Sequence, residues 1–291
     1  SDLNVQSVVL AMTSLLMSLF ITFVNILTIV VIRRTPFLRT LSNMYVTSLA
    51  ASDLVVGLGL IPLSLFYIPS LRDRLFDRNI HFCAFIFGLN LGVSIVSSIT
   101  MTLIATDRYI YILRPYAYKR VVTRRYVLVL VCLTWVFGVL YGLLPQLIHN
   151  DAAGVPKCDI TLVMPVGYLF YTNLTIYSIL IVLDFVLYTQ ILYTAYRQRR
   201  IIDAAAPVVS EPPSRKGNLR LKSIKFFLTV FGVYFMCLTP TVVCMGVDYY
   251  SPVPRFLYNT FNLLALMNSG INFVIYILLN VKFKVSVMRF L

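Results

Sequence analysis

Seven long apolar segments run along the 291-residue chain and constrain its fold more than any other feature. About 20 apolar residues cross a bilayer as one α-helix, because lipid offers the backbone no hydrogen-bond partners. Hydrophobic residues make up 59% of the chain and charged residues 12%, far from the composition of a soluble domain. We therefore expect an all-α membrane protein, a seven-transmembrane helix bundle that forms a single domain over residues 1–291. The spans are expected at 8–32, 41–68, 80–112, 126–148, 166–196, 221–249 and 256–279.

The distribution of positive charge predicts the orientation of these spans. Most lysines and arginines outside the spans lie in the first, third and fifth connections and in the C-terminal tail. Cytoplasmic loops carry such an excess, so we expect an extracellular N-terminus and a multi-pass protein of the plasma membrane. The net charge of +14 is then a sign of topology, and no nucleic-acid partner is expected.

Two further features are expected on the cytosolic side. The connection from about Arg197 to Arg220 is rich in proline and polar residues, which is typical of a flexible loop. After the last span, residues 280–291 place Phe283, Val287 and Phe290 at helical spacing with cations between them. This pattern predicts a short amphipathic helix that lies against membrane lipid at the interface.

Two of the five cysteines lie on the predicted outer side. Cys83 opens the third span and Cys158 lies in the second outer connection. Disulfides persist on the oxidising side of a membrane, and a Cys83–Cys158 bond would tie that connection to the third helix. The alternative is two free thiols.

Several polar side chains lie inside apolar spans, where they are costly and indicate function. Asp53 is in the second span, Ser97 in the third, and Asn268 and Asn272 in the seventh. Their oxygen atoms would suit a small hydrated cation such as Na⁺. An uncharged hydrogen-bond network is the other interpretation, and the spacing does not decide between them.

The inner end of the third span carries Asp107-Arg108-Tyr109, followed by Arg114-Pro115-Tyr116-Ala117-Tyr118. With these motifs, the chain resembles the rhodopsin-like, class A G-protein-coupled receptors over essentially its whole length. The resemblance is carried by Asn25, Leu49 to Asp53, Cys83, Asp107-Arg108-Tyr109, Pro115, Trp135, Pro145, Cys158, Tyr188, Cys237-Leu238-Thr239-Pro240, Asn272 and Tyr276.

That resemblance implies a receptor, not an enzyme, that passes the signal of a small-molecule agonist to a heterotrimeric G protein. It implies that helix six swings outward about Pro240 and that Asp53, Ser97, Asn268 and Asn272 form a sodium pocket; no other cofactor is expected. The residues it assigns to G-protein coupling are Arg108, Pro115, Tyr116, Tyr188 and Tyr276.

Three departures from the family pattern affect this expectation. Asn272 is followed by Phe273 where the family has proline, and Leu238 stands where it usually has tryptophan. Arg220 replaces the acidic residue that can hold Arg108 in the resting state. Because like charges repel, that lock cannot form, and high basal activity is expected.

The resemblance also locates a ligand pocket between the third, fifth, sixth and seventh helices. Asn90 stands where amine receptors carry the aspartate that pairs with the ligand. Neutral polar groups on an apolar wall suit a lipophilic ligand with hydroxyl groups, such as a steroid, and a dopamine-type amine is the other candidate ligand. The subfamilies that the chain resembles are the invertebrate dopamine/ecdysteroid receptors and the bile-acid receptors. The pocket is expected to contain Asn90, Ser94, Thr172, Asn173, Thr241, Val242, Asn262 and Leu266.

Two alternatives remain at this point: a constitutively active orphan receptor, and a transporter or channel that uses Asp53 in an ion path. The chain lacks the internal repeats expected of many transporters. The agonist and the G-protein subtype do not follow from the sequence.

Overall fold

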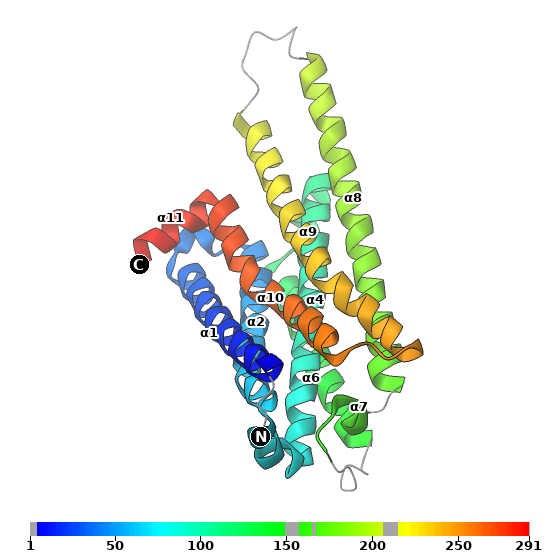
Figure 1. Cartoon of the computed structure of the whole chain (residues 1–291). Coiled ribbons are helices and arrows are strands. Elements are labelled where there is room, and N and C mark those ends of the chain that lie inside the picture. Colours follow the sequence, from blue (N-terminus) through cyan, green and yellow to red (C-terminus); the bar gives the residue numbers. More distant parts are fainter. Residues whose placement is uncertain (1–4, 149–156, 165–166, 206–214, 291) are drawn as a thin grey trace.

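A computed structural model describes residues 5–148, 157–164, 167–205 and 215–290 (Figure 1). Over these ranges the chain forms helices and no strand, and seven of the helices are long and apolar enough to cross a membrane. They are α1 (Val5–Arg34), α2 (Leu41–Phe66), α4 (Ile80–Leu113), α6 (Arg124–Ile148), α8 (Asn173–Ala205), α9 (Arg215–Tyr250) and α10 (Arg255–Leu279). The predicted all-α, seven-helix fold is confirmed.

Short helical turns connect the long helices, and local sequence explains where they begin. Proline occupies the first turn of three of these segments, where its missing N–H costs nothing. The Thr40 side chain caps α2 by accepting a bond from the Asn43 N–H at 3.3 Å. The connecting segments are η1 (Pro36–Leu38), α3 (Pro69–Arg72), η2 (Asp73–Asp77), α5 (Pro115–Val121), α7 (Ile160–Val163) and η4 (Tyr168–Thr172).

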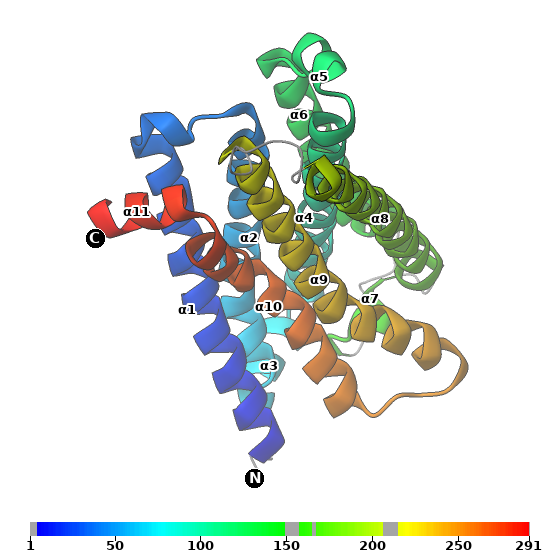
Figure 2. The same ribbon diagram turned by 90° about the horizontal axis from the view of Figure 1, so that it is seen from above.

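Helix α4 runs through the middle of the bundle and contacts α2, α6 and α8 (Figures 1 and 2). Its buried residues include a run of small and hydroxyl side chains, which let the neighbouring helices approach closely. Large apolar side chains such as Phe23 and Leu278 lie 61% and 72% exposed on the outside of the bundle. Lipid is the solvent that such a surface requires.

The fifth and sixth membrane helices are longer than the predicted spans. Helix α8 continues to Ala205 and α9 begins at Arg215, so the loop predicted from Arg197 to Arg220 was too long. The bilayer limits the apolar length of a span but not the helix, and alanine, arginine and glutamine continue a helix readily in water. Residues 206–214 lie outside the described ranges. At its other end α8 begins at Asn173 instead of residue 166, after the η4 turn.

The last helix, α11 (Val281–Phe290), turns away from α10 and lies across the end of α1 (Figure 1). Phe283 is buried and its ring lies 6.0 Å from that of Phe273, and Val287 is buried as well. Phe290 is 47% exposed, so the predicted apolar row does not bury all three of its residues in the protein. Its placement in the membrane interface stays a prediction.

Four glycines make the contact between α4 and α6 possible. Gly88 and Gly92 of α4 face Gly142 and Gly138 of α6, each pair spaced four residues apart. A Cβ added at Gly92 would lie 2.4 Å from the Gly138 carbonyl oxygen, and one at Gly88 would lie 2.3 Å from that of Gly142. Backbone cannot give way as a side-chain tip can, so only glycine fits this seam.

We therefore expect Gly92→Ala to lower the melting temperature of the purified receptor, with a destabilisation of about 1–3 kcal/mol from overpacking. Gly246→Ala on α9 is the matched control, because a Cβ there meets nothing within 4 Å. That control should be neutral or slightly stabilising, since alanine favours the helix. Equal melting temperatures for the two variants would contradict the conclusion that the α4–α6 contact requires glycine.

Candidate functional site

A cavity of about 640 Å³ lies between α2, α4, α8, α9 and α10 at the end of the bundle that holds α7. Seven of the eight predicted ligand residues line it: Asn90, Ser94, Asn173, Thr241, Val242, Asn262 and Leu266. Thr172 does not line the cavity. It ends the η4 turn directly before Asn173, and adjacent residues of a helix do not share a face. The structure therefore brings together residues from four long helices that are far apart in the sequence.

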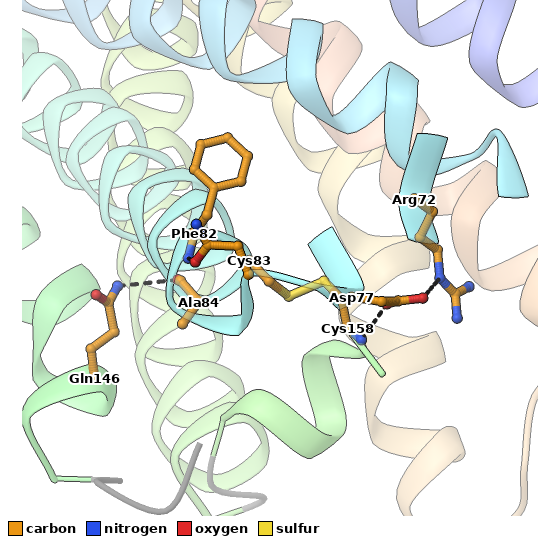
Figure 3. Close-up of a disulfide and its surroundings, with 8 residues drawn as sticks. Arg72, Asp77, Phe82, Cys83, Ala84, Gln146 and Cys158 are labelled. Carbon is orange, nitrogen blue, oxygen red and sulfur yellow. Dashed lines mark hydrogen bonds and ion pairs between the residues drawn. A yellow bond between two sulfur atoms is a disulfide. The ribbon is translucent and has the colours of Figure 1, made fainter. Parts of the chain in front are cut away.

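A disulfide between Cys83 and Cys158 holds the connection that covers this cavity (Figure 3). The Cys158 N–H donates to the Asp77 carboxylate at 2.6 Å, and Arg72 lies 3.7 Å from the same carboxylate. Asp159, the next residue, lines the cavity. The predicted disulfide is confirmed, and the alternative of two free thiols is wrong.

Two asparagines of the cavity lining, on α4 and α8, leave buried polar atoms without a partner. The Asn90 amide donates to the Ile86 carbonyl at 2.9 Å, and its Oδ1 has no hydrogen bond. Asn173 is fully buried, and its Oδ1 accepts a bond of 2.7 Å from the Tyr141 hydroxyl, which leaves its Nδ2 unpaired. Together, these two residues offer a ligand one acceptor and one donor. Leaving each unpaired costs roughly 1–3 kcal/mol, which a matching ligand would recover.

Thr241 holds two helices together in addition to lining the cavity. Its hydroxyl donates to the Phe261 carbonyl of α10 at 2.7 Å, so its proton is already used. Of the polar residues predicted for ligand binding, this one is better suited to fixing α9 against α10.

Charged and phenolic groups surround the mouth of the cavity. Asp248 lies 3.9 Å from Arg255, and Arg72 and Asp159 line the same mouth. Burial raises the pKa of Tyr67 to about 12, so its hydroxyl stays neutral there. Because Arg255 lies beside it, the Asp248 carboxylate is already compensated by a cation.

The floor of the cavity reaches the predicted sodium pocket, because Ser97, Asn268 and Ser269 all line it. Asp53 is fully buried and accepts bonds from the Ser97 hydroxyl at 3.0 Å and the Asn272 amide at 3.1 Å. The Asn268 Oδ1 atom is buried without a partner. This set of oxygens matches the ligands that hard cations prefer. The alternative hydrogen-bond network is also present, since two donors reach the carboxylate.

At the opposite end, Arg108 lies beside its neighbour in the chain. Its guanidinium is 3.0 Å from the Asp107 carboxylate. That carboxylate also accepts bonds from the Ser42 hydroxyl at 2.7 Å and the Tyr118 hydroxyl at 3.0 Å. Burial, followed by the nearby Asp107 carboxylate, raises the pKa of Tyr118, which keeps it a donor. Asp107 is thus anchored to α2 and α5, and it in turn restrains Arg108.

The other predicted coupling residues differ in exposure. Tyr188 is buried and its ring stacks on Phe231 at 4.4 Å, and Tyr276 packs against Phe283. Tyr116 is 92% exposed on α5, which Pro115 begins. The side chain of Arg220 lies outside the described part of the chain, so high basal activity stays a prediction.

Several functional candidates were not predicted from the sequence. Tyr141, Ser42 and Tyr118 carry no signal of their own, because their importance depends on partners from other helices. Asp184 is different, since a carboxylate inside an apolar span is itself a signal of function.

The seven-helix fold thus has a cavity at one end and the Asp107-Arg108 pair at the other. Residues 24–276 match the family of 7 transmembrane receptors (rhodopsin family). The chain belongs to this family, as predicted. It is a multi-pass plasma-membrane receptor that binds a small-molecule ligand and signals through a G protein, and it is not an enzyme.

Curated relatives match most of the chain. Melatonin receptor type 1B-B of Danio rerio is 30% identical over 274 residues, which cover 91% of this chain and 76% of the relative. Human melatonin receptor type 1B is 29% identical over 277 residues, covering 92% and 74%. Cannabinoid receptor 1 of Taricha granulosa is 29% identical over 296 residues, covering 94% and 60%. The invertebrate dopamine/ecdysteroid subfamily stays a prediction.

We expect Cys158→Ser to reduce both surface expression and thermal stability, because a disulfide typically contributes roughly 2–5 kcal/mol. The measurement is flow cytometry on intact cells together with a melting curve of purified receptor. Cys132→Ser, at an exposed free cysteine, is the control and should behave as the unmutated protein. If mass spectrometry of unreduced peptides finds Cys83 and Cys158 as free thiols, the expected role of this disulfide is wrong.

Proposed function

We propose that the agonist is a small, neutral, lipophilic molecule with at least one hydrogen-bond donor and one acceptor. The receptor acts as a single domain with its N-terminus outside the cell, and α11 rests on membrane lipid at the inner interface. Arg108, Pro115, Tyr116, Tyr188 and Tyr276 form the surface that engages the heterotrimeric G protein when α9 swings outward about Pro240.

The observation that carries this proposal is the pair of unpaired polar atoms in an apolar cavity. The Asn90 Oδ1 atom requires a donor and the Asn173 Nδ2 atom requires an acceptor. Leu238, Val242 and Leu266 supply apolar wall nearby. Burial of the ligand skeleton would contribute most of the affinity, and each neutral hydrogen bond about 0.5–1.5 kcal/mol.

A cationic amine fits this cavity less well than a neutral ligand. Position 90 holds an amide, and Asp248 is compensated by Arg255. Asp159 lines the mouth of the cavity, so an ammonium buried beside Asn90 would still lack a carboxylate partner there, which is strongly disfavoured. Steroids remain within the proposed class, and the names of the relatives add melatonin and cannabinoids to the compounds that merit testing.

A ligand panel tests the proposal: melatonin, a cannabinoid, a hydroxylated steroid and dopamine, each measured for binding to the purified receptor in nanodiscs. We expect a neutral member to bind, and Asn90→Leu to weaken it about tenfold through loss of one hydrogen bond. Asn90→Asp is the matched variant, because it keeps the shape and introduces a charge. It should weaken the neutral ligand and favour dopamine. Tight dopamine binding to the unmutated protein, with Asn90→Leu silent, would overturn the proposal.

We further propose that Na⁺ binds at Asp53, with Ser97, Asn268 and Asn272 supplying the remaining protein contacts. The unpaired Asn268 oxygen supports this assignment over a hydrogen-bond network alone. A ligand that binds the folded state stabilises it by mass action. Replacing choline chloride by NaCl at equal ionic strength should therefore raise the melting temperature of the unmutated receptor and leave Asp53→Asn unchanged. No sodium effect on the unmutated protein would leave only the network.

A further inference from the structure

A second carboxylate lies inside the bundle, away from the ligand cavity and from Asp53. Asp184 is on α8, one helical turn before Tyr188, and is 1% exposed. Neither of its oxygens accepts a hydrogen bond. Among the described residues no ion pair reaches it either. The fold therefore encloses an acidic group that its own contacts leave uncompensated.

Hydroxyl groups from three helices surround Asp184. Thr102 of α4 lies beside it, but its hydroxyl proton is donated to the Ser98 carbonyl at 3.3 Å. Tyr188 of α8 and Tyr234 of α9 lie within electrostatic range, and their buried hydroxyls also lack a partner. Three polar side chains thus converge at the junction of α4, α8 and α9 without satisfying one another.

The charged and titratable groups near this junction are few. Arg108 of α4 and Tyr276 of α10 lie within electrostatic range of Tyr188. Arg108 is engaged by Asp107 at 3.0 Å. In the described part of the chain, Tyr188 and Tyr234 are titratable groups within electrostatic range of Asp184.

An ionised carboxylate without a partner is poorly tolerated in a medium that holds no water. A protonated carboxyl, in contrast, carries no charge and has one O–H to donate, while its other oxygen can accept from a tyrosine. We propose that Asp184 is a proton-binding site at the α4–α8–α9 junction, occupied while these helices are packed together. The proposal goes beyond the ligand and sodium sites and does not depend on either.

Asp53 provides the contrast that separates the two carboxylates. It accepts bonds from Ser97 and Asn272, and the Ser269 hydroxyl lies within reach, so its surroundings suit an anion with a bound cation. Asp184 has beside it the Thr102 hydroxyl, whose proton is donated to the Ser98 carbonyl, so a proton is the positive charge that fits it best. Loss of that proton would leave a buried negative charge, and the junction would loosen as the pH rises.

The test is the melting temperature of the purified receptor in nanodiscs between about pH 5 and about pH 8, a range in which an unfolded aspartate has already lost its proton. The folded protein then binds one more proton than the unfolded chain, so its stability should fall as the pH rises. Asp184→Asn keeps the shape without the titration and should lose this part of the pH dependence, with a higher melting temperature at the alkaline end. Asp73→Asn, at an exposed aspartate outside the spans, should keep the full dependence.

Infrared spectroscopy gives an independent measurement on the same samples. The carbonyl stretch of a protonated carboxyl should appear in the unmutated receptor and lose one component in Asp184→Asn. An unchanged pH slope in Asp184→Asn, or no difference in the carbonyl band, would overturn the proposal. So would a melting temperature that responds to Na⁺ through Asp184 at constant pH, because the site would then hold a metal ion instead of a proton.

Discussion

The absence of water from the hydrocarbon core governs this structure, because every polar atom in the bundle must find a partner that the protein or a bound species provides. Most do so within one helix, as Thr28, Thr100 and Thr134 do by donating to the carbonyl one turn earlier. Among the described residues, a group of exceptions lies in three places: the walls of the ligand cavity, its floor at Asp53, and the Asp184 junction. Ligand, sodium ion and proton are the species that satisfy them in our account.

Helix α4 connects these three places. Its first turn is tied by the Cys83–Cys158 disulfide, its middle supplies Asn90 and Ser97, and its last turns carry Arg108. The glycine contact with α6 holds one side of α4 at close backbone distance, and α8 packs on α4 elsewhere. A ligand that binds between α4, α8 and α9 touches the helix that is expected to swing outward about Pro240 during signalling. It can therefore act directly on the contacts between α9 and its neighbours.

Much of this arrangement could be predicted from the sequence, because the bilayer imposes simple rules. Apolar length predicted seven helices, and the intramembrane position of Asp53, Asn268 and Asn272 predicted that they matter. The register between helices could not be predicted, so the pairing of Tyr141 with Asn173 and the exclusion of Thr172 from the cavity came only from the structure. The ends of α8 and α9 were missed for a related reason: hydropathy marks where lipid ends, whereas a helix ends where its backbone bonds do.

The central claim is that this bundle carries a signal from its cavity to a G protein through Arg108. Guanine-nucleotide exchange, measured with purified receptor in nanodiscs and a panel of heterotrimeric G proteins, tests it most directly. The account predicts that the unmutated receptor accelerates exchange on at least one heterotrimer and that Arg108→Ala, with its melting temperature preserved, does not. An Arg108→Ala receptor that drives exchange as fast as the unmutated protein would contradict it.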